Sequence, residues 1–371
     1  MNKWIFISYV VFLTIFTLFS YLFVDGNLPY LQFLFTDFAF KNRLITTIAY
    51  STLLSLFFGY YFYFIRLVQQ KKLSMGNIRL LVIVTIGILL LAYPAMLSYD
   101  IFNYITTAKV TYFYHENPYI IMPIEFIHDP LLLFTHAANK IALYGPTWIL
   151  FSGVPFFLGF GNFLLTLFLF KITAALSFFG VLFLYYKLHK DHMSLVLFAM
   201  NPLVLIETLV SGHNDMFVMF LVFLGIFFIQ KNKFTGWLLF ILSIGVKYAT
   251  LFLFPIFLLS LFYKNLNKKS FFQLSAIMMF IIFLLSPLRE EIYPWYAIWF
   301  LPFVFLSGRR LFIILTISLC FGLLLRYIPF MLLGTYLDPT PEIKIIVMVI
   351  PVFLAAVSYL LWLKKSFHYY Q

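Results

Sequence analysis

The sequence predicts an all-α, polytopic integral membrane protein with about twelve transmembrane helices, and its composition carries this prediction. Of the 371 residues, 64% are apolar and 22% are aromatic. Only 10% are charged, whereas a soluble globular domain carries about 25% charged residues to face water. The composition therefore excludes a soluble enzyme, a nucleic-acid-binding protein and a disordered regulator. The lone cysteine, Cys320, excludes an intrachain disulfide.

Apolar runs long enough to cross a bilayer as helices, roughly 17–25 residues, recur along the chain. The first is too long for the ~7–15-residue core of a cleaved signal peptide, and no small-residue cleavage site follows it. The helices around Lys247 and after Tyr296 are expected to be broken or tilted. The twelve expected spans lie near residues 4–24, 45–65, 80–98, 163–186, 194–210, 216–230, 234–246, 248–263, 271–287, 295–307, 311–330 and 344–363.

Basic residues between these runs predict the orientation. The densest basic loop runs from Arg66 to Arg79, and the positive-inside rule assigns it to the cytoplasm. With twelve spans, both termini then lie inside. The formal net charge of +12 falls mainly on the cytoplasmic side in this topology, so it indicates orientation and not a nucleic-acid partner.

One large outer segment, residues 99–162, is expected between the third and fourth spans. Within it, residues 146–160 are short for a span and contain Gly153 and Pro155, so we expect a re-entrant or interfacial helix there. No internal repeat, linker or run long enough for a separate soluble domain is present. Residues 1–371 are therefore predicted to form a single membrane domain.

Most of the unusual polar residues fall on the outer side in this topology. Ionisable groups at membrane depth are costly and usually line a cavity, so the sequence predicts a carboxylate-containing cavity with an aromatic rim that opens outward. The segments concerned are SYDIFNY around Asp100, HENPY at 115–119, YGPTW at 144–148, SGHND at 211–215, Lys247, Arg289 with YPWY at 293–296, and Arg326.

Several of these residues also have simpler interpretations. Asp100 is a favoured type for a helix N-cap, and residues 211–215 have the composition of a tight turn. His213 with Asp215 is a weak metal signal, because no third ligand lies nearby in the sequence. Lys247 is able to extend to the lipid headgroups. Lys171 and Arg326 lie within spans, where pairing with Glu207, Asp215 or a ligand phosphate is expected.

Taken in order, the motifs between residues 90 and 305 resemble the polyprenol-phosphate-mannose-dependent mannosyltransferases of the GT-C superfamily, of the actinobacterial alpha-mannosyltransferase type. The resemblance rests on Asp100 with Tyr104, Asn117-Pro118-Tyr119, Tyr144-Gly145-Pro146, Asn201-Pro202, Gly212-His213-Asn214-Asp215, Val246-Lys247 and Pro294-Trp295-Tyr296. It implies an inverting transferase that takes a sugar from a lipid-phosphate donor on the extracytoplasmic side of the cell membrane. In the family an Asp of the first large outer segment is the usual base, and Asp100 matches it, although two additional spans precede it here.

An inverting transfer needs a base for the acceptor hydroxyl and cations for the departing phosphate. Asp100 is the candidate base; a phosphate leaving group has a low pKa, so no acid, metal or other cofactor is required. The candidate phosphate-binding residues are Lys247 and Arg289, followed by Arg326 and His213. The candidate sugar-binding or acceptor-binding residues are Tyr104, Asn117, Tyr119, Tyr144, Asp215, Trp295 and Tyr296.

The expected partners are a polyprenyl-phosphate sugar, membrane lipids, and an acceptor that is a cell-envelope glycan, a glycolipid or a protein. Mannose follows from the resemblance alone. Two other functional classes remain open. A transporter or flippase for a lipid-linked sugar would use the same apolar groove, but it should show related halves and midplane charges. A glycan polymerase or ligase would join preassembled lipid-linked chains.

Overall fold

The computed structural model describes residues 2–31, 36–229, 231–262, 268–288 and 290–368. All regular elements within these ranges are helices, and none is a strand, so the all-α prediction is confirmed. The chain divides into two compact units. One comprises Met1–Phe38, Gln70–His192 and Val204–Phe252, and the other comprises Ala39–Gln69, Met193–Leu203 and Leu253–Gln371.

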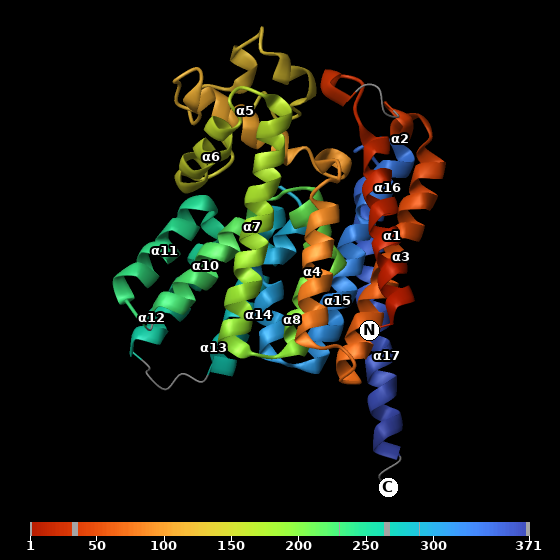
Figure 1. The fold of residues 1–371 in the computed structure, drawn as a ribbon. Helices are drawn as coiled ribbons and strands as arrows, with labels where there is room; N and C mark the ends of the chain where they lie inside the picture. Colours follow the sequence, from red (N-terminus) through yellow and green to blue (C-terminus); the bar gives the residue numbers. More distant parts are fainter. Residues whose placement is uncertain (1, 32–35, 230, 263–267, 289, 369–371) are drawn as a thin grey trace. The chain divides into compact units, whose positions relative to one another are not determined.

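The first unit is built around the long helix α7, which packs on α10 and also contacts α5 and α6 (Figure 1). Helices α10 and α11 pack against each other, as do α1 and α4. Its longer helices are α1 (Lys3–Ser20), α4 (Met75–Leu89), α5 (Asp100–Tyr112), α6 (Pro146–Leu158), α7 (Phe163–His189), α10 (Asp215–Ile229) and α11 (Lys233–Val246). Its short turns are η1 (Tyr21–Phe23), η2 (Pro29–Leu31), η3 (Pro94–Met96), η4 (Pro123–Glu125), η5 (Pro130–Phe134), the π-helical turn η6 (Ile206–Val210) and η7 (Tyr248–Leu253).

In the second unit α15 packs on α17, α16 on α3, and α13 on α14. The hydroxyl of Tyr50 on α3 donates a hydrogen bond to the Leu324 carbonyl at 3.0 Å. The helices of this unit are α3 (Arg43–Gln69), α12 (Phe254–Phe262), α13 (Lys268–Leu285), η8 (Ser286–Leu288), η9 (Pro294–Trp299), α14 (Leu301–Ser307), α15 (Arg310–Leu325), α16 (Tyr327–Leu333) and α17 (Thr340–His368). Helices α2 (Phe38–Lys41), α8 (His192–Ala199) and α9 (Pro202–Leu205) lie where the two units adjoin in the sequence.

Side-chain caps start several of these helices where the sequence has Asn or Ser. The first amides of a helix have no partner within it, and a side-chain oxygen at the N-cap satisfies one of them. Helix α6 instead begins with Pro146 after Gly145, and Pro suits a first helical position because its missing N–H would be unpaired there. The capping side chains are Asn2 for α1, Ser74 for α4, Asn162 for α7 and Asn232 for α11.

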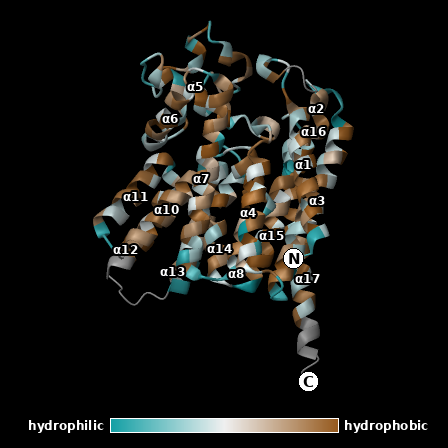
Figure 2. Ribbon diagram, in the orientation of Figure 1, coloured by the Kyte–Doolittle hydropathy of each residue, from teal (hydrophilic) through white to brown (hydrophobic). Residues whose placement is uncertain are grey.

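Long apolar helices indicate that the protein is embedded in a membrane. Within the described ranges, six helical segments are long and apolar enough to cross a bilayer, and the bent pair α8 and α9–η6 is a seventh if it forms one span. In Figure 2 hydrophobic residues line most of α10 and α15. The exposed side chains of α17 include Ile345, Phe353 and Leu360, as expected of a lipid-facing surface. Twelve spans with both termini inside remain a prediction.

Several expected spans are short or interrupted. Helices α4 and α10 have 15 residues each, about 22 Å at 1.5 Å per residue, against a hydrocarbon core of ≈ 30 Å. Helix α11 ends at Val246, and the extended residue Lys247 separates it from η7. Residues 294–307 form η9 and then the seven-residue α14. Both predicted breaks are thus present. Residues 146–158 form α6, whose 13 residues are too few for a full span.

Candidate active site

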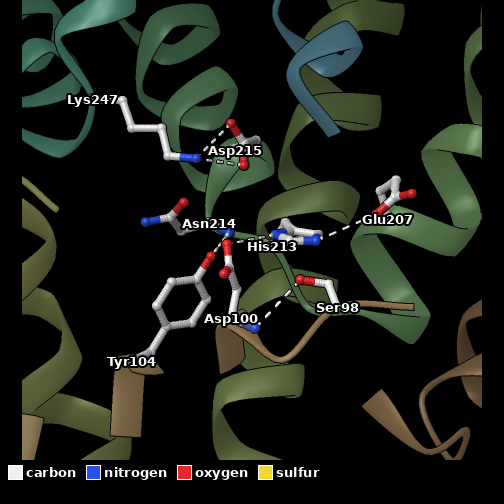
Figure 3. A network of polar contacts seen from close by, with 8 residues as sticks. All are labelled: Ser98, Asp100, Tyr104, Glu207, His213, Asn214, Asp215 and Lys247. Atoms are coloured by element: carbon white, nitrogen blue, oxygen red, sulfur yellow. Dashed lines mark hydrogen bonds and ion pairs between the residues drawn. The ribbon is translucent and has the colours of Figure 1, made fainter. Parts of the chain in front are cut away.

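Asp100 begins helix α5 and directs its carboxylate toward a cluster of charged residues in the first unit (Figure 3). Tyr99, not Asp100, occupies the N-cap position, so the Asp100 side chain is available for other contacts. Its backbone N–H donates to the Ser98 hydroxyl at 3.3 Å. A quarter of the Asp100 side chain is exposed. The carboxylate is therefore accessible to a ligand and close to buried charge at the same time.

The His213 ring lies between two carboxylates and has no exposed surface. Its Nδ1 is 3.5 Å from Oδ2 of Asp100, and its Nε2 is 3.3 Å from Oε2 of Glu207. The His213 backbone N–H also donates to the Glu207 carbonyl at 3.0 Å. Glu207 belongs to the π-helical turn η6 and is fully buried. We call Asp100, His213 and Glu207 the His213 cluster.

Gly212 makes this turn possible. Its φ is +73°, in the left-handed region that favours glycine. A Cβ at this position would meet Cδ1 of Ile101 on α5 at 2.9 Å. The terminal methyl of Ile101 can move aside, so the left-handed backbone is the main reason that a larger residue would strain the 211–215 turn.

The two carboxylates determine the protonation state of His213. Burial alone lowers the pKa of His213, but contacts with Asp100 and Glu207 outweigh burial and raise it to about 9. The ring is thus an imidazolium at neutral pH. Burial raises the pKa of Asp100, but His213, Lys247 and Asn103 outweigh that effect, and the net shift is downward. Asp100 is therefore a carboxylate at neutral pH, as a proton acceptor must be.

Asp215 and Lys247 form a second ion pair beside the His213 cluster. Asp215 is fully buried at the first position of α10, and the Lys247 ammonium lies 2.9 and 2.8 Å from its two oxygens (Figure 3). The Lys247 side chain is 16% exposed. Three carboxylates thus face two cations, and the cluster and pair together carry a net charge of −1 when His213 is protonated.

Aromatic side chains of residues 99–162 pack beside the charged groups. The Tyr104 hydroxyl accepts a hydrogen bond from the Asn214 N–H at 3.3 Å. The Tyr144 and Trp148 rings meet the Tyr104 ring edge-on, with centroids at 4.7 and 5.1 Å. The Tyr119 hydroxyl donates to the Tyr144 carbonyl at 2.9 Å. These contacts place the predicted residues Tyr104, Tyr119 and Tyr144 in one aromatic cluster.

Two glycines allow the start of α6 to lie against the end of α11, next to Lys247. The Gly145 N–H donates to the Val246 carbonyl at 3.1 Å. A Cβ at Gly145 would overlap the Gly245 carbonyl oxygen, and a Cβ at Gly245 would overlap Oγ1 of Thr147. The backbones approach this closely only because neither residue has a side chain.

The remaining predicted residues have other surroundings. Asn117 is exposed, and its side-chain oxygen accepts from the Tyr119 N–H, as in an Asx turn. Arg289 lies outside the described residues. Trp295, Tyr296 and Arg326 belong to the second unit; Trp295 stacks on Tyr293, and Tyr296 stacks on Trp299.

The two cations within spans have partners that differ from those expected. Arg326 pairs with Glu291 at 3.0 Å, and Lys344 contacts the same carboxylate at 3.3 Å. Lys171 donates to the carbonyls of Leu89 and Ala92 at the end of α4. Free carbonyls at a helix C-terminus are natural partners for a buried lysine, and this pairing was not foreseen from the sequence.

No group of three or more His, Cys, Asp or Glu side chains suited to hold a metal ion occurs among the residues that the structure describes. Both ring nitrogens of His213 face carboxylates instead. Independence from metals stays a prediction.

Glu207 is the residue of the His213 cluster that the sequence did not assign to the candidate site. A signal was present, because a lone carboxylate in the apolar run 194–210 is costly without a partner. Glu207 and His213 are six positions apart in the sequence, whereas side chains on an α-helix meet partners three or four positions away. The sequence therefore did not indicate His213 as the partner. The π-helical turn changes that spacing.

A family model described as alpha-(1->6)-mannopyranosyltransferase, N-terminal domain, matches residues 20–263. The matched region contains the His213 cluster and the Asp215–Lys247 pair. No curated protein and no solved structure matches the chain.

The raised pKa of His213 predicts a pH-dependent stability. Because the pKa in the folded state, about 9, exceeds the ordinary value of about 6.5, the stabilisation is complete below about pH 6.5 and is lost as the pH rises through about 9. Its size is on the order of 3 kcal/mol. Thermal unfolding in detergent should show a falling Tm between pH 6.5 and 9.5, and His213→Gln should weaken that fall. His128→Gln, at an exposed position, is the control. Equal slopes in all three proteins would contradict the prediction.

The close approach of the two glycines predicts a strong effect of a single methyl group. Gly145→Ala should displace the start of α6 from Val246 and reduce activity at least ~10-fold, since a 1 Å misplacement in an active site costs up to ~10²-fold. Gly87→Ala, where a Cβ meets nothing within 4 Å, is the matched control. An active Gly145→Ala protein, with activity equal to that of the control, would show that this contact does not position the site.

Proposed function

This chain belongs to the alpha-(1->6)-mannopyranosyltransferase family, and we propose that it transfers a mannosyl group from a polyprenyl-phosphate donor to a hydroxyl of a cell-envelope glycan or glycolipid. The family makes the protein a glycosyltransferase with a sugar donor and an acceptor. The lipid donor, the acceptor class and an active site on the extracytoplasmic face of the cell membrane belong to the proposal. The observation that carries it is the partly exposed Asp100 carboxylate beside the buried His213 imidazolium.

Asp100 is the base in this proposal. The acceptor oxygen forms a bond to the anomeric carbon, while the bond from that carbon to the phosphate oxygen breaks. The acceptor proton moves to Asp100, and the electron pair of the broken bond leaves with the polyprenyl phosphate. Attack opposite the leaving group inverts the anomeric centre. The lowered pKa of Asp100 supports this role because it keeps the carboxylate ionised.

Lys247 is the proposed partner of the departing phosphate in the first unit. Its ammonium is partly exposed, and its pairing with Asp215 fixes its position. A cation held in place before the reaction stabilises the developing negative charge without reorganisation. Arg289 and Arg326 remain proposed phosphate ligands. His213 was a candidate as well, but its complete burial favours an action on Asp100 over contact with the donor.

The apolar helices support a lipid donor. A polyprenyl chain is hydrocarbon, and its transfer from water into a bilayer is favourable by ≈ 0.8 kcal/mol for each CH₂. The tail of such a donor therefore lies in the bilayer, where a membrane-embedded enzyme meets it. Tyr104, Asn117, Tyr119, Tyr144, Trp295 and Tyr296 remain the proposed contacts for sugar or acceptor. Asp215 was a candidate as well, but its complete burial and its pairing with Lys247 favour an action on Lys247 over contact with the sugar.

The base assignment predicts that Asp100→Asn nearly abolishes transfer. A general base contributes ~10²–10⁴-fold, so transfer of radiolabelled mannose from a polyprenyl-phosphate donor should fall by at least ~10²-fold. Donor binding should be retained, because the amide keeps the shape of the side chain. Glu116→Gln, exposed in the same outer segment, should remain active. Near-wild-type transfer by Asp100→Asn would remove Asp100 from the chemistry, and transfer from no such donor would favour a transporter or a polymerase.

The phosphate assignment predicts weaker donor binding without Lys247. Lys247→Ala alone would leave Asp215 buried without its cation, so the informative protein is Lys247→Ala combined with Asp215→Asn. A hydrogen bond to a charged group contributes ≈ 1.5–3 kcal/mol, so the donor KM should rise roughly 10- to 100-fold. Lys140→Ala, an exposed lysine of the outer segment, is the control. An unchanged donor KM in the double variant would exclude Lys247 from the phosphate site.

A further inference from the structure

Glu207 is a buried carboxylate that no step of the proposed reaction uses. It has no exposed surface, and the fully buried His213 ring separates it from Asp100. Contact with a sugar, a phosphate or an acceptor is therefore sterically excluded. Its position within a π-helical turn is of a kind that occurs frequently at functional sites.

The charge count around His213 requires an explanation. One carboxylate suffices to neutralise an imidazolium, but this ring has two, at 3.5 and 3.3 Å. Burying an additional charge costs free energy. By itself the second carboxylate, Glu207, is thus unfavourable for stability. Its presence is explained if it changes the protonation state of the first, Asp100.

A pair of Asp100 and His213 without Glu207 has two states. In one state the ring carries the proton and Asp100 is ionised; in the other the proton lies on Asp100 and both groups are neutral. A medium of low polarity favours the neutral state, because separated charges are costly there. The neutral state would leave Asp100 protonated and unable to accept another proton.

The second anion reverses this preference. With Glu207 ionised at 3.3 Å from Nε2, loss of the ring proton would place a buried carboxylate beside a neutral ring. The proton therefore stays on His213. A hydrogen bond from the backbone N–H of His213 to the backbone carbonyl of Glu207 fixes the positions of the two residues relative to each other.

We propose that Glu207 is a positioning residue for the transfer reaction: it holds the proton on the His213 ring and thereby keeps Asp100 free to accept the proton of the acceptor hydroxyl. This inference rests on the proposed role of Asp100 as the base. It assigns a function to the part of the site that is most remote from the substrate.

The other charged and titratable groups near the ring act less directly. Lys247, after α11, stabilises the Asp100 carboxylate, but its charge is paired with Asp215 on α10. Lys171 on α7 bonds to carbonyls of Leu89 and Ala92. Burial raises the pKa of Tyr104 on α5, and the charges of Asp100 and Asp215 raise it further. Glu207 is thus the carboxylate that faces the ring from the side opposite Asp100.

The test is the pH dependence of kcat in Glu207→Gln, a variant of the same size without the charge. In the wild type, kcat should be flat between pH 5.5 and 8.5, because Asp100 stays ionised. In Glu207→Gln the shared proton moves onto Asp100, so kcat should fall about 10-fold at pH 5.5–6 and recover as the pH rises. The donor KM should not change. Glu207→Asp, which keeps the charge, should retain the flat profile, and Glu116→Gln is the control.

A second measurement does not depend on transfer. In the wild type the Tm falls as His213 loses its proton. In Glu207→Gln this fall should occur at a pH lower by about one unit or more, because His213 then releases its proton at a lower pH. A kcat reduced by the same factor at every pH, or a profile identical to the wild type, would overturn the inference. If the wild type transfers nothing, the proposed function fails, and the Tm curves alone decide whether Glu207 controls the proton on His213.

Discussion

The compensation of buried charge is the constraint on which the candidate site depends. A charged group removed from water is stable only beside an opposite charge or strong hydrogen-bond partners. His213 satisfies this condition with Asp100 and Glu207, and Asp215 satisfies it with Lys247. These contacts join α5, the η6 turn, α10 and the break after α11. The second unit obeys the same constraint, since Glu291 pairs with both Arg326 and Lys344. The polar interior of each unit is therefore organised by pairing, within helices whose outer surfaces are apolar.

Much of the fold was predictable because lipid imposes simple requirements. Composition alone indicated a helical membrane protein, and short apolar runs indicated the breaks around Lys247 and after Tyr296. Helix lengths were less predictable: α4 ends at Leu89, although its expected apolar run continues to residue 98. Hydropathy indicates which segments are apolar enough for a membrane, but it does not indicate where a helix ends. The end depends on capping and tertiary contacts, such as the hydrogen bonds from Lys171 to the carbonyls of Leu89 and Ala92.

Part of the candidate cluster was predictable from the sequence, but its pairings were not. Asp100, Tyr104, His213, Asp215 and Lys247 were all expected in one cavity, and the structure gathers them in the first unit. Glu207 was expected to neutralise a lysine or an arginine and contacts a histidine instead. Pairing depends on distance in three dimensions, which a single sequence does not contain. The same holds for Asn117, whose motif indicated a ligand contact and whose side chain forms a turn.

The π-helical turn at Ile206–Val210 has a consequence for how this site tolerates change. An α-helix advances by about 100° per residue, and a π-helical turn accommodates one residue more than an α-helical turn. Removal of one residue between Glu207 and His213 would restore α-helical hydrogen bonding and rotate the Glu207 carboxylate by about a quarter of a turn, away from the ring. The identities of Thr208 and Leu209 matter for packing, whereas their number determines the geometry. In this segment the length of the chain is itself part of the active site, and homologues with the same chemistry should vary in side chains there before they vary in residue count.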